Sequence, residues 1–115
     1  MKILEILKII AVVGTIATGL FSLIRPRSVI DFTGLSPQGG RGVTEIRAVL
    51  GGAFIGLGVA PLLLKKTPAA YQMLGITYLA IAIARAPAMI IDQSAVASNV
   101  ISLAVEIIFG VILVL

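Results

Sequence analysis

Four charged residues lie inside stretches of sequence that are otherwise apolar: Glu45, Arg47, Arg85 and Glu106. A charged side chain costs about 2.5–3.5 kcal/mol at the centre of a membrane helix, so such residues are rare there and usually pair with one another. An arginine that meets a glutamate removes two unpaired charges from hydrocarbon together. The residue types therefore predict an intramembrane ion pair between Arg85 and Glu106.

Uncharged polar residues are expected beside this pair. At about 100° per residue, Asn99, Ser102 and Glu106 share one face of a helix, and Tyr78 shares a face with Arg85. Pro87 can kink the helix next to Arg85 and open space there. The sequence thus predicts an intramembrane polar cluster of Glu45, Arg47, Tyr78, Arg85, Asn99, Ser102 and Glu106.

Glu45 and Arg47 bring opposite charges to the start of the second apolar stretch. Residues two apart on a helix face away from each other, so these two are not expected to form an ion pair. We expect Glu45 to point into the protein interior, toward Arg85. Arg47 is expected to point elsewhere, to lipid headgroups or a neighbouring helix.

The composition places these residues in a membrane. Of the 115 residues, 59% are hydrophobic and 12% charged, and the mean hydropathy is +1.17. Soluble domains average about 45–50% apolar and about 25% charged residues. A bilayer core needs roughly 20 apolar residues per helix. The predicted fold class is all-α, an integral membrane bundle of four transmembrane helices with antiparallel up-down topology. We expect one domain, 1–115, with spans at 3–24, 43–64, 69–91 and 95–115.

Two segments of this plan have alternatives. The first apolar stretch resembles a signal peptide, but no small-x-small cleavage site precedes Arg25, so a membrane span is predicted. Residues 25–42 form the longest polar stretch, either a short interfacial helix or a solvated loop. Four spans put both termini on one side, and the lysines of that side mildly favour the cytoplasm.

Small residues recur every four positions along the second span. Such spacing lets helix backbones approach closely, which is how membrane helices pack without a hydrophobic drive between them. The pattern predicts a helix-packing surface, within one chain or between two chains, made of Ala48, Gly52, Gly56 and Ala60.

Several functions are excluded by composition. The chain has no Cys and no His, which removes thiol chemistry and the usual ligands of zinc and haem, and no metal site is predicted. A net charge of +4 with two tyrosines provides no basic patch or stacking surface for nucleic acid. No pair of residues resembles a nucleophile with its base, so no catalytic residues and no enzymatic activity are predicted.

The layout resembles the DoxX-like group of small four-helix bacterial membrane proteins. The features that carry the likeness are the sequence EIRAVLGG at 45–52, Arg85 late in the third span and Glu106 within the fourth. The resemblance implies an antiparallel bundle in a bacterial cytoplasmic membrane and partnership with redox or quinone-linked enzymes. Position by position, it implies a polar and packing core of Glu45, Arg47, Gly51, Gly52, Arg85 and Glu106.

The first functional hypothesis is a structural or accessory protein, acting as a subunit of a larger membrane complex or as a homo-oligomer. Its partners would be the lipid bilayer and other membrane subunits or further copies of itself, and it needs no cofactor. The second hypothesis is a carrier that uses the Arg/Glu cluster for a small molecule, a quinone headgroup or an ion, with a quinone or a lipid as the bound group. An enzyme acting on a lipid or quinone is the third.

Overall fold

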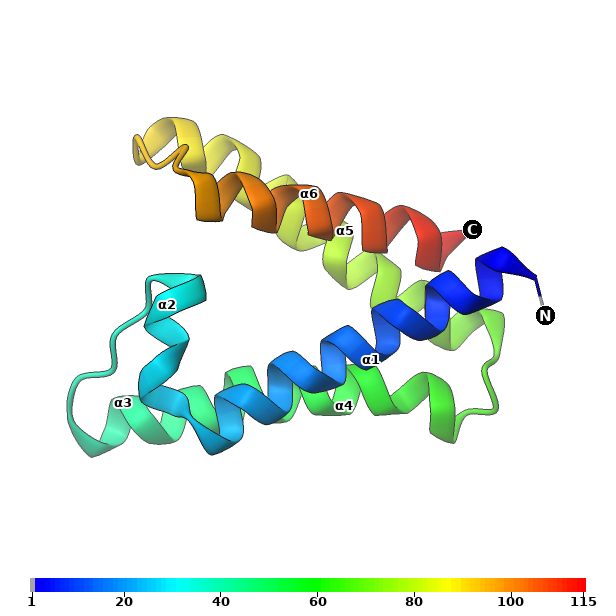
Figure 1. The fold of residues 1–115 in the computed structure, drawn as a ribbon, viewed down its shortest axis with the longest axis horizontal. Coiled ribbons are helices and arrows are strands. Elements are labelled where there is room, and N and C mark those ends of the chain that lie inside the picture. Colours follow the sequence, from blue (N-terminus) through cyan, green and yellow to red (C-terminus); the bar gives the residue numbers. More distant parts are fainter. Residues whose placement is uncertain (1) are drawn as a thin grey trace. The chain divides into compact units, whose positions relative to one another are not determined.

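The computed structural model describes residues 2–115 and is all-α over that range (Figure 1). Four stretches of the described chain are long and apolar enough to cross a membrane: Ile3–Ile24, Gly39–Leu63, Pro68–Ile91 and Ala97–Val114. This confirms the predicted fold class in its number and type of membrane helices. The helical segments in chain order are α1 (Ile3–Ile24), η1 (Pro26–Val29), α2 (Ile30–Thr33), α3 (Gly39–Glu45), η2 (Ile46–Gly51), α4 (Gly52–Leu63), α5 (Pro68–Ile91) and α6 (Ala97–Val114).

The second membrane stretch differs from a uniform α-helix. It begins at Gly39, ahead of the predicted start at residue 43, and runs through α3, η2 and α4 without interruption. Its middle segment, η2, is π-helical. A π-helical segment carries more residues per turn than an α-helix, so it rotates the preceding residues relative to those that follow. Faces calculated at 100° per residue therefore do not carry across η2.

The polar stretch 25–42 contains short helices as well as non-helical residues, and its place relative to the membrane interface stays a prediction. Pro26 lies in the first turn of the 3₁₀ helix η1, where a missing N–H group costs nothing, and α2 follows directly. Gly34 ends α2 with a left-handed φ of 75°, a conformation that glycine adopts without strain. Residues 34–38 are not helical, and α3 then begins.

Two compact units make up the chain, one of which is Ile10–Lys65. In this unit α1 packs antiparallel against η2 and α4, and the contact is made by backbone. A Cβ atom placed on Gly19 would lie 2.7 Å from the Ile55 nitrogen and 2.8 Å from the Gly51 oxygen. Further along, a Cβ on Gly58 would lie 3.0 Å from the Ile16 nitrogen. Glycine at these positions allows the close approach that holds helices together in lipid.

The packing face predicted for the second span does not make the contact with α1 in this unit. A Cβ added to Gly52 or Gly56 meets nothing within 4 Å, and Ala48 is exposed. The face toward α1 instead carries Gly51 and Gly58, which are buried. The stretch has small residues on more than one face, and the face that packs is the one that matches Gly19 and Ile16 of α1. Contact between chains through the predicted surface (Ala48, Gly52, Gly56 and Ala60) stays a prediction.

The other unit joins Lys66–Leu115 with the beginning of α1, up to Ile9. Its main feature is an antiparallel hairpin of α5 and α6, connected by residues 92–96. A Cβ on Gly75 would lie 2.9 Å from the Gly110 oxygen, so these backbones also approach closely. The Lys8 ammonium lies 5.3 Å from the centre of the Tyr71 ring, which is within cation–π range and links α1 to α5.

Candidate functional site

The predicted ion pair joins α5 to α6. Arg85 donates from Nε to Glu106 Oε1 at 2.8 Å and from Nη2 to Glu106 Oε2 at 2.7 Å. This two-pronged geometry matches the planar guanidinium to the carboxylate and is the strongest form of such a pair. Antiparallel packing of the hairpin makes it possible, because Arg85 lies late in α5 and Glu106 lies midway along α6.

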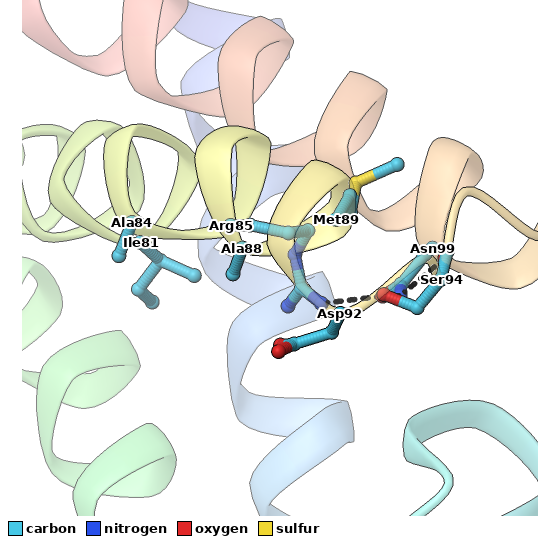
Figure 2. Close-up of a pocket in the computed structure, with 8 residues that line it drawn as sticks. All are labelled: Ile81, Ala84, Arg85, Ala88, Met89, Asp92, Ser94 and Asn99. Carbon is cyan, nitrogen blue, oxygen red and sulfur yellow. Dashed lines mark hydrogen bonds between the residues drawn. The ribbon is translucent and has the colours of Figure 1, made fainter.

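Asn99 extends the ion pair toward the turn between the helices. Its side-chain oxygen accepts a hydrogen bond of 2.9 Å from Arg85 Nη1, and its Nδ2 donates to the Ser94 carbonyl oxygen at 2.9 Å (Figure 2). Nδ2 also lies 3.3 Å from the Ser94 hydroxyl. We call this set of Arg85, Glu106, Asn99 and Ser94 the Arg85 network.

Burial differs along the Arg85 network. The Glu106 side chain is 9% exposed, whereas that of Arg85 is 30% exposed. No buried side-chain nitrogen or oxygen in residues 2–115 lacks a hydrogen-bond partner. The buried carboxylate is therefore neutralised in place, and the guanidinium is the charged group of the pair that reaches the surface of the hairpin.

Two other predicted residues, Tyr78 and Ser102, lie on the same hairpin. Tyr78 is buried, and its ring packs edge-on against Phe109, with the ring centroids 5.5 Å apart. Ser102 is half-buried on α6, between Asn99 and Glu106. The hairpin thus gathers five of the predicted residues: Tyr78, Arg85, Asn99, Ser102 and Glu106.

Glu45 and Arg47 lie in the other compact unit and have different partners. Arg41, one turn earlier, takes the place that we predicted for Arg85, with its Nη2 atom 3.1 Å from Glu45 Oε1. This pair is exposed, with 51% of the Glu45 side chain accessible. The prediction assumed a uniform helix and missed both the earlier start at Gly39 and the π-helical segment.

Arg47 reaches a neighbouring helix, one of its two expected destinations. Its Nη1 atom donates a hydrogen bond of 2.9 Å to the carbonyl oxygen of Leu23, near the C-terminal end of α1. The last carbonyls of a helix lack intrahelical donors and carry partial negative charge, so a cation is favoured there. Arg47 therefore stabilises the contact between α1 and η2.

An open groove of about 430 Å³ runs along the hairpin beside Arg85 (Figure 2). Its lining changes from apolar to polar toward the turn between the helices. The residues that line it are Ile81, Ala84, Arg85, Ala88, Met89, Asp92, Ser94 and Asn99.

Sequence reasoning missed Asp92 and Ser94. Both lie in the connection between the third and fourth apolar stretches, where polar residues are ordinary and carry little information. The available signal was their position, because Asp92 follows Arg85 by less than two helical turns and Ser94 precedes Asn99 by five residues. Within residues 2–115 no group of three or more His, Cys, Asp or Glu residues could hold a metal ion.

Fold and site together define a class of protein. Large apolar side chains are exposed on the long helices, such as Ile83 and Ile90 on α5 at 74% and 81%, as lipid-facing residues are. With four helices of membrane length in the described chain, the protein is a small integral membrane protein.

The sequence pattern of one protein family matches almost all of the chain. The match is to DUF4345, a domain of unknown function, over residues 3–115, and the chain belongs to this family. No curated protein and no solved structure matches the chain.

Proposed function

We propose that this protein is a structural or accessory membrane protein, a subunit of a larger membrane complex or a homo-oligomer. The observation that carries the proposal is the use of the intramembrane charges. Both carboxylate oxygens of Glu106 accept hydrogen bonds from Arg85, and Asn99 takes a third donor of the same guanidinium. Charges used in this way fix the register of α5 against α6.

The proposal includes a location and excludes catalysis. The resemblance to the DoxX-like group supports a bacterial cytoplasmic membrane, and the lysines near the N-terminus and between α4 and α5 favour cytoplasmic termini. The absence of Cys and His from the sequence, and of a nucleophile paired with a base, supports a role without enzymatic activity.

Gentle purification tests this function. The protein is extracted in a mild detergent, and its mass and stoichiometry are measured by native mass spectrometry. We expect a second copy of the chain or another membrane protein at a fixed ratio. A monomer that carries no partner, both in detergent and in native nanodiscs, would contradict the proposal. Substituting Gly56→Leu then tests whether the predicted packing surface holds the complex together, because the larger side chain would block close approach of a second helix.

A carrier is the second candidate, and one observation favours it. The Arg85 side chain is 30% exposed and lines the groove, so part of the charged group is accessible from outside the hairpin. Purified protein in liposomes would then show flux of a proton or small molecule that Glu106→Gln abolishes without a loss of thermal stability. If the substitution destabilises the protein and no flux is measured with the unmodified chain, the carrier hypothesis fails.

A further inference from the structure

The groove beside Arg85 is apolar at one end and polar at the other, as a phospholipid is along its acyl chain and headgroup. Its deeper end along α5 is lined by Ile81 and Ala84, and its end at the turn by Asp92 and Ser94. Its volume of about 430 Å³ falls in the range of ligand pockets, roughly 300–1,000 Å³. Because the turn ends a membrane helix, the apolar end points into hydrocarbon and the polar end lies near the headgroups.

Arg85 retains donors for a ligand. A guanidinium carries five N–H donors. The groups used within the protein are Nε and one N–H of Nη2, both toward Glu106, and one N–H of Nη1, toward Asn99. One N–H on each of Nη1 and Nη2 remains. These two donors belong to a side chain that lines the groove, so an acceptor such as a phosphate oxygen can bind there.

Asp92 supplies the opposite charge in the same groove. It is exposed and directly follows the last residue of α5. Its backbone N–H donates to the Ala88 carbonyl oxygen, whereas its carboxylate forms no hydrogen bond or ion pair with another residue of the described chain. A carboxylate at the C-terminal end of a helix is disfavoured by the helix dipole, so a positively charged partner is favoured there. Arg85 is already neutralised by Glu106. The groove as a whole therefore favours a ligand that contains a cation.

We propose that this groove binds an amine-bearing phospholipid, with the lipid phosphate on the remaining N–H groups of Arg85 and the lipid ammonium on Asp92. The glycerol and the start of an acyl chain then lie along Ala88, Ala84 and Ile81. A phosphatidylethanolamine headgroup has this pairing of charges. Phosphatidylglycerol lacks the cation for Asp92, and the quaternary amine of phosphatidylcholine has no N–H to donate.

Lipid titration of the delipidated full-length protein tests the proposal. Phosphatidylethanolamine, phosphatidylcholine and phosphatidylglycerol with identical acyl chains are added in turn, and bound lipid is measured by native mass spectrometry. We expect phosphatidylethanolamine to bind about tenfold more tightly than the other two, which is the effect of one charge-assisted hydrogen bond. Asp92→Asn should remove this preference. The matched control Asp31→Asn removes an exposed carboxylate outside the groove and should keep it.

Three results would overturn the proposal. One is equal binding of the three lipids, and another is a preference for phosphatidylethanolamine that survives Asp92→Asn. The third is displacement of the lipid by soluble O-phosphoethanolamine at equal concentration, which would show that the groove takes a free headgroup rather than a lipid. The result does not depend on the proposed accessory role, because binding is measured on the isolated protein.

Discussion

The two compact units hold their membrane helices together by different means. In Ile10–Lys65 the contact of α1 with η2 and α4 rests on Gly19, Gly51 and Gly58, where backbones nearly touch. A polar contact between its helices is the hydrogen bond from Arg47 to a backbone carbonyl. The α5–α6 hairpin also has a close glycine contact, at Gly75 and Gly110, and adds the Arg85 network.

This difference indicates what the charges are for. Lipid tails are as apolar as leucine side chains, so close backbone packing is sufficient to associate two membrane helices. The first unit shows such packing without an ion pair between its helices among the described residues. The buried Glu106 is therefore not required for two helices to pack. The free-energy cost of burying its carboxylate is offset only in the register of the hairpin that places Arg85 beside it.

The largest effect is expected from Arg85→Gln. This change leaves the Glu106 carboxylate buried without its cation, and breaking such a pair costs about 3 kcal/mol. The loss of unfolding free energy is measured by titrating the protein in mixed micelles with a denaturing detergent and monitoring circular dichroism. The matched control is Arg41→Gln in the exposed pair, for which less than about 0.5 kcal/mol is expected. Equal stability of the two variants would contradict a structural role for the Arg85 network.

A smaller loss is expected when a methyl group is added at the glycine contact of the first unit. Gly19→Ala places a Cβ 2.7–2.8 Å from backbone atoms of Ile55 and Gly51, which cannot move independently of their helix. Overpacking of this kind costs about 2 kcal/mol. The control Gly56→Ala adds the same group where nothing lies within 4 Å, and it should be neutral or slightly stabilising. A loss at Gly56 as large as that at Gly19 would show that the surface of Ala48, Gly52, Gly56 and Ala60 is also packed.

The smallest effect concerns Arg47. Arg47→Met keeps an unbranched side chain and removes the hydrogen bond to the Leu23 carbonyl. We expect a loss of about 1 kcal/mol, since the bond is charge-assisted but exposed. The measurement is the same unfolding titration. A variant as stable as the unmodified chain would show that this hydrogen bond adds nothing measurable to the packing between α1 and η2.

Particular residues show what the sequence could and could not predict. The pairing of Arg85 with Glu106 was predictable, because two charges in apolar stretches have few ways to be neutralised, and helical spacing placed Asn99 on the same face. The partner of Glu45 was not, because a π-helical segment changes which face a residue occupies and leaves no recognised signal in composition. The packing face was ambiguous for another reason. Small residues lie on both sides of the second span, and only the shape of α1 selects Gly51 and Gly58.

The groove could not be predicted from the sequence at all. It depends on the distance between α5 and α6 near their connection and on the direction of the Arg85 side chain. Asp92 and Ser94 gain significance only when the hairpin brings them beside Arg85.

The central claim, that the intramembrane charges are structural, is tested most directly by a double-mutant cycle. Unfolding free energies are measured for Arg85→Gln, Glu106→Gln and the double variant, and for the corresponding Arg41 and Glu45 variants. We predict a double variant at the network that is more stable than the sum of the single losses implies, with a coupling energy of about 2 kcal/mol. The exposed pair should show a coupling below about 0.5 kcal/mol. Single variants at Arg85 and Glu106 that remain fully stable, with loss only of a proton or small-molecule flux, would contradict the claim.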